Sequence, residues 1–256
     1  MASALPEKFA SKLLTCLNQR TRPIPVEEIA SALGLEVRGV KTSAFECNLL
    51  RNQYGAGGVI AIGGKNSDVR RLRFTIAHEI GHYVMERRKN SVCVFGDLQL
   101  WNQSTPAKEA AANRFAAELL LPSNHVGPII NRCGVSMETA KVIKEAFKTS
   151  LTSSAIRCVE LTSQECALVY IVDGIVKSYR PSKAWRPHVF TGCPVGKSTL
   201  ARKLLQDQTT FKQSGRVNAL AWVDGSKFVE IGAELLEDST HLLSYKTILS
   251  FLTAIR

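Results

Sequence analysis

The sequence predicts an α+β fold, because helix-like and strand-like stretches occupy largely separate parts of the chain. Helical patterns dominate residues 70–161, whereas short apolar runs joined by turn residues dominate from residue 166 onward. Another short apolar run, residues 58–63, is bounded by glycines and precedes the first long helix. The chain has 256 residues, which is enough for one or two domains that each bury a substantial core.

The N-terminal part predicts a short helix, two strands and one long helix. Residues 26–33 favour the short helix, and residues 35–40 and 58–63 favour strands, of which the second is typical of a buried strand. Residues 70–87 contain no proline and carry apolar side chains at helical spacing. We therefore expect this stretch to form one amphipathic helix.

The long helix contains a pattern that is typical of metal binding. His78 and His82 are one helical turn apart, so both imidazole rings face the same side and can reach one metal ion. Glu79 lies about 100° around the helix from His78, close enough to hydrogen-bond a water on that metal. This H-E-x-x-H arrangement is that of zinc peptidases, in which the glutamate is the general base. Gly81 either lets another segment approach closely or is merely tolerated.

Catalytic zinc usually has three protein ligands and one water, so a third ligand is needed. Residues 105–121 are rich in strong helix formers and predict a second helix. We expect Thr105 to cap it, Pro106 to take its first position and Pro122 to follow its end.

Two glutamates of this second helix are candidates for the third ligand. Glu109 and Glu118 are nine residues apart (118 minus 109), which places them on opposite faces of a helix, so only one can face the metal. The small residues 110–112 beside Glu109 permit close helix packing, and we therefore favour Glu109. Glu118 remains either a structural or surface carboxylate or a second active-site group.

Two stretches of the chain resemble the ImmA/IrrE family of metallopeptidases. Residues 73–82 (RFTIAHEIGH) are similar to its first motif, and residues 109–122 (EAAANRFAAELLLP) to its second. The resemblance is strong over residues 24–122 and weaker for about forty residues beyond them. It implies a set of site residues: zinc ligands His78, His82 and Glu109, and the base Glu79.

The resemblance also implies three parts of the chain. These are a zincin-like metallopeptidase domain over residues 1–122, a helix-turn-helix segment over 123–165, and a GAF-like sensor domain over 166–256. It further implies that the substrate is a helix-turn-helix transcriptional repressor, whose cleavage derepresses stress, DNA-damage or mobile-element genes.

The resulting functional prediction is a zinc-dependent endopeptidase. Tyr83 is a candidate oxyanion donor because it adjoins His82, although it points about 100° away from that residue. The ligand types also leave Mn²⁺ and Fe²⁺ open as metals. The alternative is a DNA-binding transcriptional regulator in which the metal site is structural or vestigial. A closed fourth ligand on the metal would favour that alternative.

The three-helix segment is the place where DNA binding would be expected. Residues 123–132, 136–147 and 152–161 predict three short helices, the first two separated by Cys133 and Gly134. Residues 122–165 carry five Lys and Arg against four acidic residues, which is a weak basis for DNA binding. The first candidates for DNA contact are Ser153, Ser154 and Arg157.

Charge and composition predict a cytoplasmic protein. The net charge is +11, and its densest basic run surrounds the motif helix. Such a run is either a solvated face or a surface that attracts an acidic or DNA-associated substrate. The run comprises Lys65, Arg70, Arg71, Arg73, Arg87, Arg88 and Lys89. The seven cysteines form no C-x-x-C pair, which indicates reduced thiols. No apolar stretch approaches the ~18 residues of a membrane span, and the N-terminus lacks a signal-peptide pattern.

The C-terminal part predicts strands with one helix between them. Asp173-Gly174 between two apolar runs predicts a β-hairpin, and residues 222–229 predict a second hairpin with a longer turn. Residues 198–206 predict a helix. Residues 192–198 resemble a phosphate-binding P-loop, but the spacing between its glycines is one residue too short. We interpret them as a turn that leads into the helix at Ser198.

Overall fold

The computed structural model is a mixed α+β protein that divides into two compact units. The first comprises residues 1–125 and 144–150, and the second residues 126–143 and 151–256. The structure describes residues 5–42, 44–53, 56–63, 68–86, 106–207, 210–225, 232–242 and 247–255, and the backbone of 91–93. The three-part division at 122/123 and 165/166 stays a prediction.

The first unit contains a four-stranded mixed sheet. Its strands are β1 (Leu35–Gly39), β2 (Cys47–Arg51), β3 (Gly58–Ile62) and β4 (Ser91–Cys93), in the order β1-β3-β2-β4. β1 runs parallel to β3, and β2 runs antiparallel to both β3 and β4. The two predicted strands are thus confirmed. Sequence reasoning missed β2 and β4, because short strands that carry polar residues have weak patterns.

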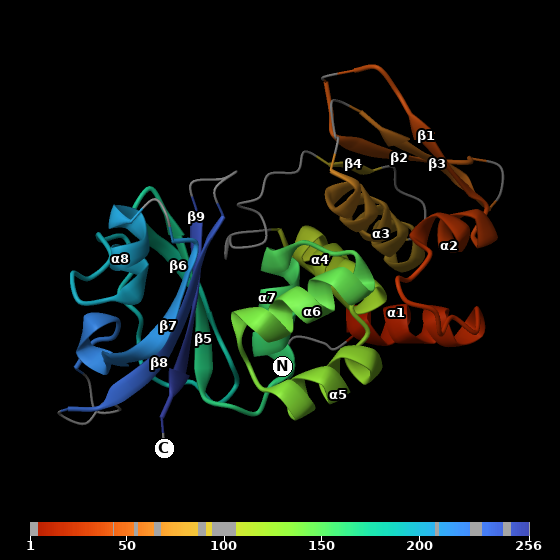
Figure 1. Ribbon diagram of the computed structural model, residues 1–256. Helices are drawn as coiled ribbons and strands as arrows, with labels where there is room; N and C mark the ends of the chain where they lie inside the picture. Colours follow the sequence, from red (N-terminus) through yellow and green to blue (C-terminus); the bar gives the residue numbers. More distant parts are fainter. Residues whose placement is uncertain are drawn as a thin grey trace. The chain divides into compact units, whose positions relative to one another are not determined.

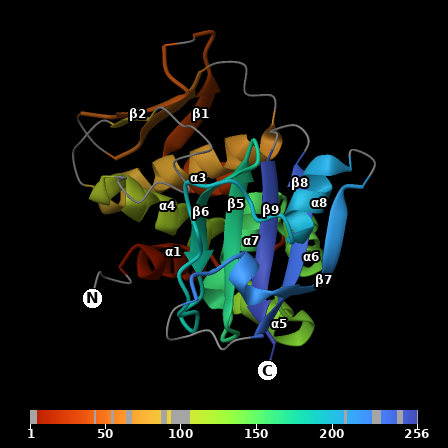
Figure 2. The same ribbon diagram turned by 90° about the vertical axis from the view of Figure 1, so that its left-hand side faces the viewer.

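Four helices complete the first unit: α1 (Leu5–Cys16), α2 (Val26–Ala32), α3 (Val69–Met85) and α4 (Ala107–Leu120). α3 lies along one face of the sheet, as both views show (Figures 1 and 2), and it packs against α4. Asp68 caps α3 by accepting a hydrogen bond from the Arg70 backbone N–H, 2.8 Å away. Thr105 lies outside the described residues, and Pro106 is the N-cap residue of α4 rather than its first helical residue.

The three helices expected after residue 122 are present as α5 (Ser123–Cys133), α6 (Met137–Phe147) and α7 (Leu151–Leu161). The predicted DNA contacts on α7 are wrong in two of three cases. Arg157 is 5% exposed and Ser154 is fully buried, because α7 packs against the C-terminal sheet. Arg157 also pairs with Glu160 at 3.1 Å. Neither side chain is accessible to a DNA groove.

The second unit is built on a five-stranded antiparallel sheet, whose order β6-β5-β9-β8-β7 Figure 2 shows. The strands are β5 (Cys166–Val172), β6 (Ile175–Pro181), β7 (Lys212–Asn218), β8 (Glu234–Leu242) and β9 (Thr247–Ala254). The hairpin at Asp173-Gly174 is confirmed, and both turn residues have positive φ, 49° and 75°.

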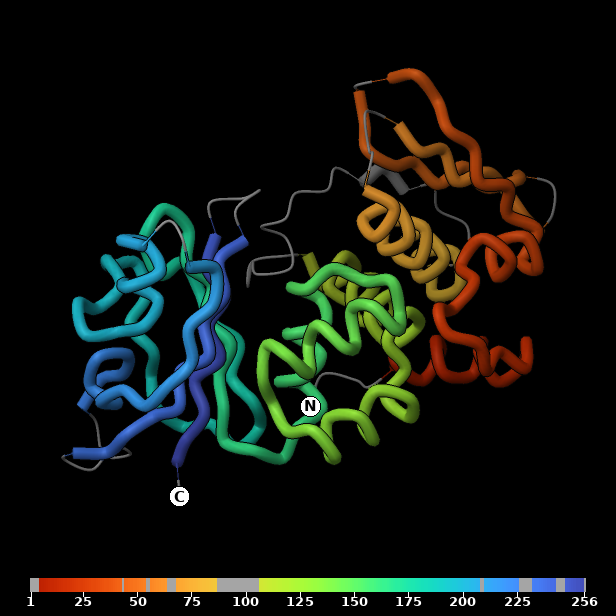
Figure 3. Tube along the Cα trace, viewed as in Figure 1, coloured from red at the N-terminus to blue at the C-terminus, as the bar shows by residue number. Residues whose placement is uncertain are grey.

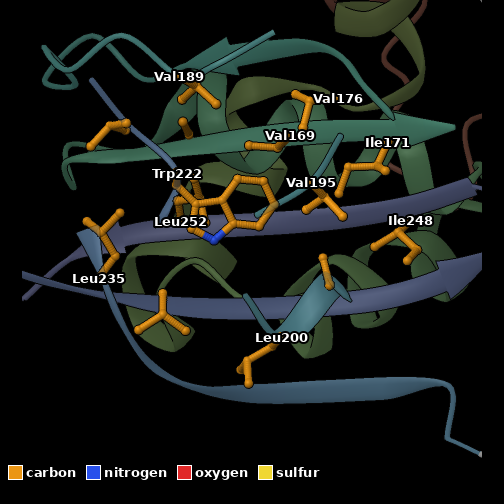
Figure 4. Close-up of a cluster of buried hydrophobic side chains, with 14 of the residues drawn as sticks. Val169, Ile171, Val176, Val189, Val195, Leu200, Trp222, Leu235, Ile248 and Leu252 are labelled. Carbon is orange, nitrogen blue, oxygen red and sulfur yellow. The ribbon is translucent and has the colours of Figure 1, made fainter. Parts of the chain in front are cut away.

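The second predicted hairpin is wrong at its start. Residues Ala219–Ala221 form a short 3-10 helix, and Trp222 follows with its side chain in the core of the second unit (Figure 4). Trp222 there joins apolar residues of the sheet and of α8 (Leu200–Gln206), among them Val169 and Leu200. Residues 226–229, the remainder of the predicted hairpin, lie outside the described residues.

Two adjacent carboxylates of β8 hold the N-termini of two helices. Glu237 accepts hydrogen bonds from the backbone N–H groups of Leu200 (3.0 Å) and Ala201 (2.6 Å) at the start of α8. Asp238 accepts one from Met137 N (2.7 Å), the first residue of α6. Because successive strand residues point to opposite faces, β8 binds one helix on each side of the sheet.

Glu237 also explains why the P-loop-like segment is not one. The backbone N–H groups at the start of α8, where a P-loop would hold phosphate, are already bound by this buried carboxylate. The helix begins at Leu200 with Thr199 as its N-cap, two residues after its predicted start at Ser198.

Candidate metal centre

Three predicted site residues converge between α3 and α4. The ligand atoms of His78, His82 and Glu109 all lie within 4.8 Å of one another. The two histidine Nε2 atoms are 2.9 Å apart, and the Glu109 carboxylate oxygens lie 3.2 Å from His78 Nε2 and 3.3 Å from His82 Nε2. Both histidines are buried, whereas the Glu109 side chain is 30% exposed.

Close packing of the two helices brings Glu109 to the histidines. A Cβ added at Gly81 would lie 3.0 Å from Cδ1 of the Phe115 ring on α4, which is too close for ordinary packing. The interpretation of Gly81 as a point of close approach is therefore confirmed. Phe115 is fully buried and fills the space that a larger side chain at position 81 would need.

The outer nitrogen of each histidine has an oxygen partner. His78 Nδ1 lies 2.9 Å from Asn113 Oδ1, and His82 Nδ1 lies 2.9 Å from Glu86 Oε1. Carboxylate and amide oxygens only accept, so each Nδ1 donates its proton and each Nε2 carries a lone pair. Two lone pairs that face each other at 2.9 Å repel unless a cation lies between them. Two imidazole nitrogens and a carboxylate are a donor set that fits Zn²⁺.

The electrostatics of the three residues favour a bound cation. The close approach of His78, and then of His82, holds the pKa of the Glu109 carboxyl well below its usual range, so that it is ionised. Burial lowers the pKa of His82, but the neighbouring carboxylates of Glu109 and Glu86 raise it more, and the net shift is upward. The site therefore stabilises positive charge at the position where the ligand atoms meet.

Glu79 is fully buried beside this site and interacts with a cysteine of β2. Cys47 is also fully buried, and its pKa is raised by burial, by the charge of Glu79 and by its hydrogen bond to Glu79. Cys47 is thus a neutral thiol that donates to the carboxylate. Nothing in its sequence context separates Cys47 from the other scattered cysteines.

Tyr83 lies at the turn between β2 and β3. Its hydroxyl oxygen accepts a 2.6 Å hydrogen bond from the Gly57 backbone N–H, and its ring lies under the Arg51 guanidinium, 4.8 Å from the ring centre. Arg51 in turn donates to the His82 carbonyl oxygen at 2.7 Å. These contacts fix the end of α3 against the sheet. The role of Tyr83 as an oxyanion donor stays a prediction.

Glu118 has the structural role that sequence reasoning left open. Its Oε1 accepts hydrogen bonds from the Ser123 backbone N–H (3.0 Å), the Ser123 hydroxyl (2.9 Å) and the Ser11 hydroxyl (3.2 Å). The residue is 3% exposed, and it ties the end of α4 to the start of α5 and to α1.

The described members of the basic run make contacts within the protein. Arg73 is 7% exposed and donates to the Ile24 carbonyl oxygen at 2.7 Å, so its expected place on a solvated face is wrong. Arg71 pairs with Glu46 at 2.9 Å, and Arg70 lies 3.5 Å from Glu145. The remaining members, Lys65 and residues 87–89, lie outside the described part of the chain.

Sequence reasoning missed the histidine partners Asn113 and Glu86. Each follows a predicted ligand by four residues, Asn113 after Glu109 and Glu86 after His82. Residues four apart share a helix face, so this spacing could have identified both.

The chain also matches a known protein family. The model of the IrrE N-terminal-like domain, peptidase family M78, matches residues 30–158, which is half of the chain. The chain belongs to the ImmA/IrrE family. The matched region of this ImmA/IrrE protein runs from orange to green in Figure 3 and contains α3 and α4 with the candidate metal centre.

Solved structures add a similar fold. A Mycobacterium tuberculosis transcriptional regulator aligns with a TM-score of 0.58 and 13% identity, covering 98% of this chain and 88% of that chain. No curated protein matches the sequence significantly. Among the helices that the structure describes, none is long and apolar enough to cross a membrane.

Proposed function

We propose that the protein is a zinc-dependent endopeptidase. The observation that carries this proposal is the convergence of His78, His82 and Glu109 beside the buried carboxylate of Glu79. Three protein ligands leave one position of a tetrahedral zinc ion for water, which is the pattern of catalytic rather than structural sites. Membership of a peptidase family supports the same reading.

The residues have separate roles in peptide hydrolysis. His78, His82 and Glu109 would hold Zn²⁺, which when bound supplies a Lewis acid that activates water and polarises the scissile carbonyl. Glu79 accepts the proton of the attacking water and then delivers it to the nitrogen of the departing amine. The Cys47 thiol, which donates to Glu79, helps to hold this carboxylate in place.

We infer that the substrate is a helix-turn-helix transcriptional repressor, cut in the cytoplasm to derepress stress, DNA-damage or mobile-element genes. Support comes from family membership. On α7, Arg157 and Ser154 are buried. Those buried side chains and the near-neutral segment weaken the alternative, a DNA-binding regulator with a structural metal site.

We further propose the three parts that the family resemblance implies. The mixed sheet with α3 and α4 would be the zincin-like domain, α5 to α7 the helix-turn-helix segment, and the five-stranded sheet the GAF-like sensor domain. A cavity of about 240 Å³ in the second unit gives that sensor a candidate ligand site. Trp222, Phe190 and Cys193 are among the residues that line it.

The proposal is tested by incubating the purified full chain with the small repressors encoded in its own genome. We expect one repressor to be cut at a single position when Zn²⁺ is present, and no cut after treatment with a chelator. Restoring Zn²⁺ should restore the cut. If no repressor is cut under any metal condition, while the chain binds DNA in a salt-dependent way, the regulator alternative is correct.

A further inference from the structure

We propose that Asn113 and Glu86 are positioning residues that set the tautomer and ring orientation of His78 and His82. Asn113 does so as a neutral acceptor, whereas Glu86 also acts through its charge. The inference rests on the proposed metal centre, but it concerns metal affinity rather than cleavage. Each residue binds the outer nitrogen of one histidine at 2.9 Å, on the side away from the point where the ligand atoms meet.

Asn113 lies on the same face of α4 as Glu109. The two residues are one turn apart on α4, so the packing that brings the Glu109 carboxylate to both Nε2 atoms also brings the Asn113 oxygen to His78 Nδ1. His78 is fully buried, which leaves no water shell to satisfy its outer nitrogen in place of Asn113. Asn113 therefore contributes a neutral acceptor.

Glu86 binds His82 through two parts of the residue. It is the C-cap residue of α3, where its backbone N–H donates to the His82 carbonyl oxygen at 2.9 Å, and its carboxylate accepts from His82 Nδ1. Its second oxygen lies 3.7 Å from Lys108 of α4. The Glu86 side chain is only 19% exposed, so its charge is poorly screened and acts on the His82 ring.

The chemical difference between the partners predicts different responses to substitution. An acceptor on Nδ1 fixes the tautomer that leaves Nε2 free to bind metal, whether or not that acceptor is charged. A carboxylate also makes the imidazole a stronger ligand. At position 113 the presence of an acceptor should therefore decide metal affinity, whereas at position 86 the charge should contribute as well.

The test is a measurement of Zn²⁺ and Co²⁺ affinity on the full chain, by competition with a chromophoric chelator. We expect Asn113→Leu and Glu86→Ala each to weaken binding by about 10–100-fold. Asn113→Asp keeps an acceptor and adds a carboxylate, so it should bind at least as tightly as the wild type. Glu86→Gln keeps an acceptor without the charge and should be intermediate. Glu36→Ala is the matched control, because its side chain is 57% exposed and its carboxylate pairs with Arg38 on β1.

A spectroscopic readout separates positioning from a merely structural role. If Glu86 acts on the His82 ring, the visible absorption of the Co²⁺ form should shift in Glu86→Gln even if that variant melts at the wild-type temperature. Unchanged affinity and an unchanged Co²⁺ spectrum in folded Asn113→Leu and Glu86→Ala would overturn the inference and leave the proposed peptidase standing. Normal metal binding by the wild type without any cleavage would overturn only the peptidase.

Discussion

Replacing Glu79 with glutamine is expected to leave the metal bound and to lower the rate of repressor cleavage by at least about 10²–10⁴-fold. Glutamine has nearly the same shape as glutamate, but its amide does not take up the proton of the attacking water. The ligands His78, His82 and Glu109 are unchanged, so the affinity for Zn²⁺ should stay close to that of the wild type. Single-turnover cleavage and metal content, measured on the same preparation, check both parts of this expectation.

A suitable control is Glu138→Gln, which makes the same chemical change at a side chain that is 68% exposed and far along the chain from the motif. That variant should cleave at the wild-type rate. A wild-type rate in Glu79→Gln itself would show that another group is the base, and the mechanism proposed here would be wrong.

The largest effect on stability is expected for Glu237→Ala in the second unit. The Glu237 carboxylate is fully buried and accepts from Leu200 N, Ala201 N, Trp222 Nε1 (2.8 Å) and the Ser239 hydroxyl (2.8 Å). Alanine would leave these donors without their acceptor, and each unsatisfied buried donor costs about 1–3 kcal/mol. We therefore expect the free energy of unfolding to fall by about 3 kcal/mol or more, as measured by urea denaturation followed by tryptophan fluorescence.

Glu234→Ala provides the comparison on the same strand. Glu234 is exposed and makes one surface ion pair, to Arg216 at 3.3 Å, so its loss should change the free energy of unfolding by no more than about 0.5 kcal/mol. Equal stabilities of Glu237→Ala and Glu234→Ala would mean that the carboxylate does not hold α8 and Trp222 in place.

The parts of the site that the sequence could predict are those set by local helix geometry. His78 and His82 share a face because four residues make about one helical turn. Only one of Glu109 and Glu118 can face the metal, because nine residues place them on opposite faces of the helix. Both relations hold within single helices, and the structure places the three side chains together.

The parts that could not be predicted depend on contacts between distant segments. Cys47 reaches Glu79 from a strand thirty-two positions earlier (79 minus 47), and no local pattern indicates that pairing. Arg157 looked solvent-facing because arginine usually is, yet α7 packs against β5 and β6 and buries it. The neighbours of Trp222 favour a strand, and the sequence therefore predicts one there. In the structure, Trp222 follows a short 3-10 helix and its indole ring packs in the core of the second unit.

The central claim is that His78, His82 and Glu109 hold a catalytic zinc ion. The most direct test is a crystal structure of the zinc-loaded protein, with anomalous data collected at the zinc absorption edge. We predict one anomalous peak bound by the two Nε2 atoms and the Glu109 carboxylate, with a water as fourth ligand within hydrogen-bond distance of Glu79. A zinc ion with a fourth protein ligand in place of the water, or no anomalous peak at this position, would contradict the account.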